Sequence, residues 1–205
     1  MCKIVLCMDN GNSCLEETKK YLGLHDCKVY TLCREEQDIR TLVEKINQKE
    51  GKIDLLLLGV DEDIPQDGAI GEKHDCELLL EVLSGQIGRT QEVIDAAIPL
   101  LRQGNLKRIG MITKKDSCIS YCKSDSNFGQ HMVWAGLNML GKIYFNLLRP
   151  EGFTFRWYCA EENSGGMSAG EYLLSGLCYD AGEPYMHSDE NRLVMRDAYL
   201  REIAW

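Results

Sequence analysis

The sequence has no long hydrophobic run. Its first apolar stretch, residues 4–8, ends at Asp9 and is far shorter than the core of a secretory signal peptide. No later stretch approaches the length of a membrane-spanning helix. Basic residues are also few: 23 Lys and Arg stand against 32 Asp and Glu, a formal net charge of −9, which opposes binding to the phosphates of nucleic acids. We therefore predict a soluble, cytoplasmic protein that binds neither a membrane nor nucleic acid.

The sequence also lacks paired cysteines. It has ten cysteines, and none forms a C-x-x-C pair. Thiols of cytoplasmic proteins are kept reduced, so a disulfide framework is not expected. Cys118 and Cys122 are the closest pair, but no histidine lies near enough in sequence to complete a zinc-ligand pattern with them. We expect no metal site.

What the sequence does have is an alternation of short aliphatic runs with segments of helical spacing. The runs predict strands at 3–8, 28–33, 53–60, 107–113, 153–159 and 193–195. Helical spacing predicts helices at 16–24, 39–46, 75–83, 86–101, 131–148 and 171–177. At 205 residues the chain is long enough for one full core. The alternation predicts a single α/β domain over residues 1–205, with a doubly wound parallel sheet in three layers.

Five runs together carry a family resemblance. They are IDLLLLGV (53–60), GQIGRTQEVIDAAIPLL (85–101), KRIGMIT (107–113), WAGLNMLGKIYFNLLRPEGFTF (134–155) and RLVMRDAYLREIAW (192–205). In order and spacing they resemble the short-chain dehydrogenase/reductase (SDR) family, which implies a Rossmann-like sheet. About one βα unit of the family pattern is missing near the N-terminus. The strand at 28–33 therefore represents either the second or the third family strand.

The resemblance fails at the cofactor motif. Family members hold the pyrophosphate of NAD(P) on a glycine-rich turn after the first strand, at a helix N-terminus. Aligned on KIVLC, the three glycine positions fall on Asp9, Ser13 and Leu15, whose side chains would repel or crowd a diphosphate. The turn after the family's fourth strand is reduced to Leu58 and Gly59. We therefore expect no cofactor at the degenerate positions Asp9, Ser13, Leu15 and Gly59, with NAD(P) as the alternative.

The catalytic motif fails as well. The family uses a tyrosine as acid and base, and a lysine one helical turn later lowers its pKa. Aligned on AGLNML (135–140), the tyrosine position holds Gln130 and the lysine position holds Trp134. A shifted alignment places Phe128 and Met132 there, which restores neither residue.

Two other family positions give mixed results. The active-site asparagine falls on Gly85. Ser117 has the right separation to be the serine that polarises the substrate carbonyl, and Tyr121 supplies a phenol in the same loop. Ser117 and Tyr121 are therefore the candidate catalytic residues of a rearranged site.

These losses favour an SDR-like protein without NAD(P)-dependent oxidoreductase activity, which acts as a dimeric binding, regulatory or scaffold protein. The alternative is an oxidoreductase that uses Ser117 and Tyr121. A third hypothesis is a small-molecule site in the crevice at the carboxyl ends of the strands. Its walls would be Asp9, Asn10, Gly59, Thr113, Ser117 and Gln130.

The helix at 131–148 indicates how the chain could assemble. Its polar side chains are confined to one stripe, at positions 131, 138, 142 and 146, so more than its sheet-facing side must be buried. In the SDR family this helix and the one matching 86–101 pack against their copies in a second subunit, which implies a homodimer. The alternative is that loops of the same chain cover the helix. We also expect Leu15, Trp134 and the turn at 58–59 to narrow the space for a dinucleotide, with Trp134 packed rather than solvent-facing.

Overall fold

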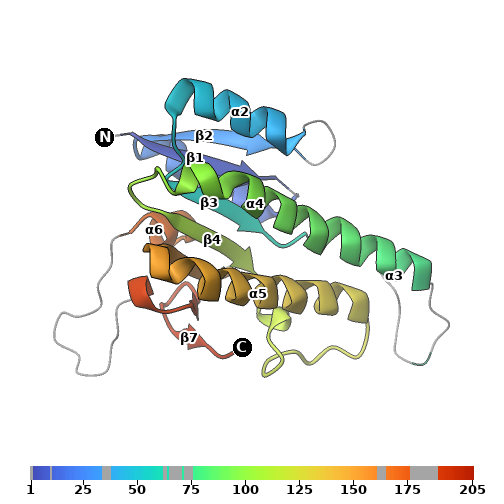
Figure 1. Ribbon diagram of the computed structural model, residues 1–205. Helices are drawn as coiled ribbons and strands as arrows, with labels where there is room; N and C mark the ends of the chain where they lie inside the picture. The colour runs from blue at the N-terminus through green and yellow to red at the C-terminus, as the bar shows by residue number, and fades with distance from the viewer. Residues whose placement is uncertain are drawn as a thin grey trace.

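The computed structural model describes residues 2–9, 11–33, 38–61, 64, 71, 76–160, 165–175 and 189–205. They form one sheet with helices on both faces (Figure 1). The strands are β1 (Lys3–Met8), β2 (Cys27–Leu32), β3 (Leu55–Gly59), β4 (Arg108–Thr113), β5 (Thr154–Cys159), β6 (Val194–Arg196) and β7 (Glu202–Ile203). The α-helices are α1 (Ser13–Leu24), α2 (Ile39–Glu50), α3 (Cys76–Leu83), α4 (Arg89–Leu101), α5 (Phe128–Leu148) and α6 (Ala169–Leu174).

The sheet has the order β2-β1-β3-β4-β5-β6-β7. The first six strands are parallel, and β7 pairs antiparallel with β6. The order reverses between β1 and β3, which is where doubly wound sheets bind nucleotides beyond the carboxyl ends of their strands. The predicted Rossmann-like α/β fold is confirmed.

The position of β2 identifies the missing unit. In the Rossmann order 3-2-1-4-5-6, the strand beside the first is the second. β2 pairs with β1 through six residues, from Lys3 opposite Cys27 to Met8 opposite Leu32, so residues 28–33 represent the second family strand. No strand of the described chain lies beyond β2. The shortening therefore removes the third family strand from this edge.

Alternate side chains of each strand enter two separate cores, as the period of a β-strand requires. Leu6 and Leu56 face the layer that contains α2, α4 and α5. Val5 and Leu55 face the layer that contains α1 and α6. Figure 1 shows α4 and α5 in front of the sheet, with α2 above them. The strands therefore read as continuous aliphatic runs because both faces of the sheet are covered.

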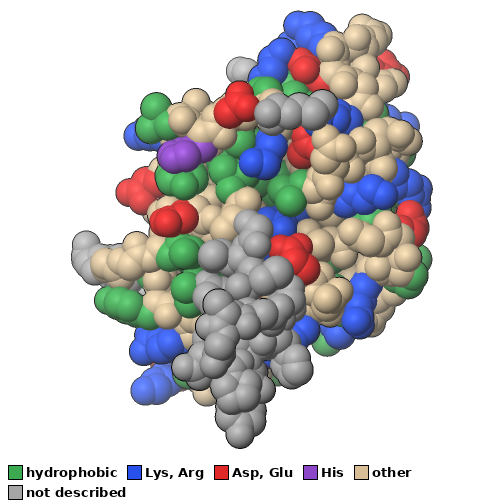
Figure 2. All heavy atoms as spheres, turned by 90° about the vertical axis from the view of Figure 1, so that its left-hand side faces the viewer, with side chains coloured by type: hydrophobic (Ala, Val, Ile, Leu, Met, Phe, Trp, Pro, Cys, Tyr) green, Lys and Arg blue, Asp and Glu red, His purple; other side chains and the backbone are tan. Residues whose placement is uncertain are grey.

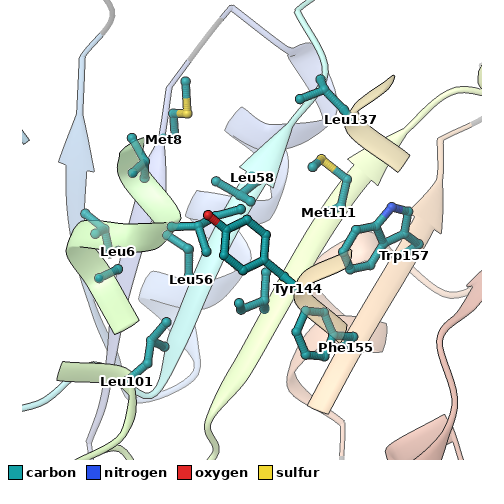
Figure 3. Packing of buried hydrophobic residues seen from close by; sticks show 14 of the residues in the cluster. Leu6, Met8, Leu56, Leu58, Leu101, Met111, Leu137, Tyr144, Phe155 and Trp157 are labelled. Atoms are coloured by element: carbon teal, nitrogen blue, oxygen red, sulfur yellow. The ribbon is translucent and has the colours of Figure 1, made fainter. Parts of the chain in front are cut away.

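Tyr144 of α5 lies at the centre of the larger core (Figure 3). Its hydroxyl donates a hydrogen bond to Asp95 Oδ1 of α4 at 2.5 Å, which fixes the two helices against each other. One turn earlier, Gly141 lets α5 approach β5 closely, since a Cβ at Gly141 would lie 2.1 Å from Cζ2 of Trp157.

Two buried arginines attach the end of α6 to the sheet. Arg108 of β4 donates to the carbonyl of Leu173 at 2.7 Å, and Arg156 of β5 donates to Ser175 Oγ at 2.7 Å. Both guanidinium groups also donate to one carboxylate oxygen of Glu190. Burial and the adjacent Arg156 charge lower the pKa of Arg108 to about 10. The pair is a structural anchor at the side of the sheet where the strands begin.

Figure 2 views the molecule from the side at which the parallel strands begin. Lys and Arg side chains are interspersed there with Asp and Glu in the coloured part of this face, so it presents no extended patch of one sign. Among the described residues, no helix combines the length and the apolar character needed to cross a membrane. The nine described cysteines are all free thiols.

Several predicted element bounds are wrong. The helices predicted at 75–83 and 86–101 are one continuous helical run, because the π-helical turn η1 (Ser84–Gly88) joins α3 to α4. α5 begins at 128 rather than 131, and α6 (169–174) begins at 169 rather than 171. Residues 176 and 177 of the predicted helix lie outside the described residues. β7 was not predicted, because two residues are too few to show an alternation.

Candidate functional site

Asn12 ties the two strands at the switch point together. It follows β1 and caps α1, because its Oδ1 accepts a hydrogen bond from the amide of Leu15 at 3.0 Å. Its Nδ2 donates to the carbonyl oxygen of Val60, just beyond β3, at 3.0 Å. Asn12 and Leu15 are both fully buried. The start of α1 is therefore held against the end of β3 by a direct side-chain contact.

Trp134 and Gln86 contact the chain just beyond β3 from the opposite face of the sheet. The indole Nε1 of Trp134 donates to the main-chain oxygen of Asp61 at 2.9 Å. Gln86 Nε2 donates to the side chain of Asp61 at 2.7 Å. Trp134 is 7% exposed, which confirms the prediction that it is packed. Asp61 is therefore fixed, through its side chain and its main chain, by residues of η1 and α5.

Asp9 places a negative charge at the first family glycine position. Its Oδ2 accepts a hydrogen bond from Lys19 Nζ at 2.9 Å, and its Oδ1 accepts one from the amide of Gly11 at 3.2 Å. Burial opposes ionisation, but these hydrogen bonds outweigh it and hold the pKa of Asp9 below its usual value. Asp9 is therefore ionised near neutral pH.

Ser117, the first candidate catalytic residue, is buried in a hydrogen-bonded network. Its hydroxyl donates to the carbonyl of Lys114 at 2.6 Å. It accepts from Thr113 Oγ1 at 3.0 Å and from Asn138 Nδ2 at 2.9 Å. Asn138 Oδ1 in turn accepts from the indole of Trp157 at 3.1 Å. The hydroxyl of Ser117 thus connects the loop after β4 to α5.

The chain was compared with known proteins. No protein-family profile matches it, and no curated protein matches its sequence. Solved structures do match. A protein assigned as a short-chain alcohol dehydrogenase from Burkholderia multivorans superposes over 100% of both chains, with a TM-score of 0.72 and 14% identity.

Two further structures contain nucleotides. The 3-ketoacyl-(acyl-carrier-protein) reductase from Brucella melitensis, complexed with NADH, matches over 77% of this chain and 74% of its own, with a TM-score of 0.64 and 14% identity. A short-chain dehydrogenase from Shigella flexneri, complexed with NADP, matches over 77% of this chain and 76% of its own, with a TM-score of 0.63 and 10% identity. The chain has the short-chain dehydrogenase/reductase fold.

Within the SDR fold, Tyr121 lies in the loop between β4 and α5. Its ring packs partly buried against the larger core, and Lys115 Nζ lies 5.0 Å from the ring centroid. Gln130 and Trp134, which the sequence alignment matches to the family's tyrosine and lysine, are in the first two turns of α5. Asn10 lies outside the described residues.

A cleft lies where α1, α6 and the carboxyl ends of β4 and β5 meet. It has a volume of about 620 Å³, within the range of small-molecule sites. We call it the α1–α6 cleft; it is lined by Ser13, Cys14, Glu17, Thr18, Tyr21, Lys114, Tyr158, Ala160 and residues 166–170. The hydroxyl of Tyr158 donates to the carbonyl of Met167 at 2.8 Å, which fixes one wall.

The α1–α6 cleft lies at the end of the strands where the crevice was predicted, but it is a different hollow. None of the five described residues among the predicted walls, Asp9, Gly59, Thr113, Ser117 and Gln130, lines it. Gly59, Thr113 and Ser117 are buried. Of the degenerate cofactor positions, only Ser13 faces the cleft. A stripe of small and polar residues on α1, at 13, 14, 17 and 18, is the signal that indicates this wall.

Proposed function

We propose that this protein has no NAD(P)-dependent oxidoreductase activity and acts as a dimeric binding, regulatory or scaffold protein in the cytoplasm. The observation that carries this proposal is the bridge from Asn12 to Val60 across the switch point. In nucleotide-binding Rossmann sheets this crevice is where the dinucleotide lies. Here the side-chain amide of Asn12 contacts the main-chain oxygen of Val60 across it.

The residues at the switch point do not fit a dinucleotide. A pyrophosphate needs glycines so that main-chain N–H groups can reach it at the start of the first helix. The ionised carboxylate of Asp9 repels a diphosphate, and the buried side chain of Leu15 takes the place of the third glycine. Asp61 lies just beyond β3, in the turn that would face the cofactor. Its side chain already accepts a hydrogen bond from Gln86, and its main-chain oxygen accepts one from Trp134.

The α1–α6 cleft supports a binding function. It combines an acidic and a basic side chain, Glu17 and Lys114, with hydroxyl groups and main-chain atoms. Sites for small molecules have this concave form, with a few polar groups that orient the ligand. We infer a small, polar ligand for the cleft.

The outer face of α5 supports a homodimer. It carries four exposed large apolar side chains: Met132, Met139, Ile143 and Leu147. The sequence pattern placed Asn138 on the polar stripe of α5, but its side chain is buried and donates a hydrogen bond to Ser117. The exposed face of α5 is therefore more apolar than the sequence pattern indicated. A contiguous apolar face of this kind is typical of a protein–protein interface. A two-fold contact through α5 and α4 would cover it.

Two measurements test this function together. The first is thermal unfolding with millimolar NADH or NADPH, since a ligand at 100 times its dissociation constant adds about 2.7 kcal/mol to the free energy of unfolding. We expect no stabilisation. The second is a turnover screen of carbonyl compounds and alcohols with both cofactors, and we expect none to react. Turnover that Ser117→Ala or Tyr121→Phe abolishes would instead support the oxidoreductase alternative.

A further inference from the structure

A second hollow lies on the other face of the sheet, between α5 and the C-terminal residues. It has a volume of about 320 Å³ and is bordered by Ser117, Ile119, Ala135, Asn138, Met139, Lys142, Leu193 and Trp205. We call it the α5 groove. It shares only the loop after β4 with the α1–α6 cleft, and none of the same residues line both.

The rim of the α5 groove is unusually apolar for a surface. Ile119 is 87% exposed, Met139 is 61% exposed and Trp205 is 39% exposed. Apolar side chains of this size that gather around a hollow mark a binding surface, because their exposure to water is unfavourable. Trp205 is held in place, since Ser120 Oγ donates to its main-chain oxygen at 3.1 Å and its ring lies 6.3 Å from that of Trp157.

The polar groups at the floor of the groove are already satisfied. Asn138 donates to Ser117 and accepts from Trp157. The hydroxyl of Ser117 donates to the carbonyl of Lys114. A polar group of a ligand would therefore find no hydrogen-bond partner at the floor of the groove. The apolar part of a ligand fits there best.

Among the residues that the structure describes, Lys142 is the one charged side chain that lines the groove. It is exposed, and its ammonium group lies 4.7 Å above the ring centroid of Phe145. In a protein with a formal net charge of −9, an isolated cation at the edge of an apolar hollow selects for an anionic group by charge complementarity.

We propose that the α5 groove binds a small aromatic or aliphatic carboxylate. The apolar body lies between Ile119, Ala135 and Trp205, and the carboxylate lies at Lys142. This site is separate from the switch point and from the α1–α6 cleft. It therefore does not depend on whether the protein binds a nucleotide.

The test uses 1-naphthoate as the anionic probe and 1-naphthalenemethanol as its uncharged counterpart, with binding measured by calorimetry on the full chain. Ala135→Leu fills the groove with a side chain that favours helix formation. Lys142→Gln removes the charge, Lys142→Arg restores it, and Lys20→Gln removes an exposed charge on α1 as a control. Circular dichroism and light scattering of each variant establish that its fold and oligomeric state are unchanged.

We expect naphthoate to bind the wild type and Lys20→Gln equally, and Ala135→Leu to abolish binding. Lys142→Gln should weaken naphthoate about fivefold, as for a solvent-accessible ion pair, and leave naphthalenemethanol unchanged. Lys142→Arg should restore naphthoate binding. No binding to the wild type, or binding that Ala135→Leu does not alter, would overturn the proposal. Equal loss of both probes in Lys142→Gln would refute the role of the charge.

Discussion

The indole N–H of Trp134 donates a hydrogen bond to the main-chain oxygen of Asp61 at 2.9 Å. This contact joins α5 to the end of β3, beside the switch point of the sheet. The sequence alignment matches Trp134 to the lysine of the SDR pattern, and the structure shows that Trp134 is buried. From the α1 side, the side chain of Asn12 contacts the chain just beyond β3 through its hydrogen bond to the carbonyl of Val60.

Restoring the family pair should not restore activity. In the double variant Gln130→Tyr with Trp134→Lys, the tyrosine and lysine return, but Asp9, Leu15 and the Asn12 bridge still obstruct the cofactor. We expect no NAD(P)H oxidation with any carbonyl substrate, measured by absorbance on protein whose fold is verified by circular dichroism. Oxidation above the rate without enzyme would show that the cofactor pocket has survived.

Asn12 both caps α1 and contacts Val60, so we predict that its replacement lowers the free energy of unfolding by more than the loss of a helix cap alone. Asn12→Ala removes the cap of α1 and the donor to Val60, and we expect it to lower the free energy of unfolding by about 2–3 kcal/mol. Ser168→Ala removes the cap of α6, in which the Ser168 hydroxyl accepts from the amide of Glu171, and should cost about 1 kcal/mol. Chemical denaturation measures both. Equal costs would mean that the contact with Val60 contributes nothing.

Asp54 should make stability depend on pH. It is buried, yet hydrogen bonds from Lys52 and from the amides of Ile4 and Asn105 outweigh burial and hold its pKa below the usual value. Because its pKa is lower in the folded state than in the unfolded state, the Asp54 carboxylate contributes to the free energy of unfolding. This contribution is complete above the pKa of an unfolded aspartate, about 4, and is lost as the pH falls through the pKa of the folded state.

Asp54→Asn tests this dependence. At neutral pH we expect the variant to be less stable than the wild type by about 2 kcal/mol. The difference should shrink as pH falls below about 4. Urea denaturation at a series of pH values measures it, and a difference that stays constant down to acid unfolding would contradict the assignment.

The contact between Gly141 and Trp157 predicts opposite effects for two glycine substitutions. Gly141→Ala places a methyl group 2.1 Å from the indole ring, and we expect a loss of about 1–3 kcal/mol from overpacking. Gly23→Ala, within α1, meets nothing within 4 Å and should gain about 0.5–1 kcal/mol from the better helix propensity of alanine. Thermal unfolding separates the two, and a stabilising Gly141→Ala would show that α5 shifts freely from β5.

The apolar face of α5 predicts a dimer that one charge disrupts. We expect light scattering to give a dimeric mass for the wild type and a monomeric mass for Ile143→Glu, because a two-fold contact buries the new carboxylate twice. Leu24→Glu changes an apolar residue on α1 that is even more exposed than Ile143, at 83% against 57%, and should remain dimeric. A monomeric wild type at high protein concentration would exclude the dimer.

The sheet was predictable from the sequence because its strands are short aliphatic runs with helical segments between them. Leu55 to Leu58, for example, are all buried, since helices cover both faces. The identity of the second strand was not predictable, because the pairing of Cys27–Leu32 with β1 depends on a contact between distant segments. Helical spacing predicted two helices at 75–83 and 86–101, because a spacing pattern does not show that the π-helical turn at Ser84–Gly88 joins them.

The contacts at the switch point were predictable only in part. Replacement of the family lysine by Trp134 indicated a packed side chain, and the structure confirms it. The Asn12 bridge was not predictable, because it joins residues 48 positions apart. The α1–α6 cleft was missed for the same reason: it combines one face of α1 with Lys114 and the loop at 166–170. A role for Ser117 and Tyr121 in catalysis remains a prediction.

The most direct test of the account is the affinity of the wild-type protein for NADH and NADPH, measured by calorimetry. The bridge from Asn12 to Val60 and the packed Trp134 predict no saturable binding, with any dissociation constant weaker than about 1 mM, or less than about 4 kcal/mol of binding free energy. Saturable binding of either nucleotide at a dissociation constant of about 10 μM would contradict the account, because the crevice would then open to admit the cofactor.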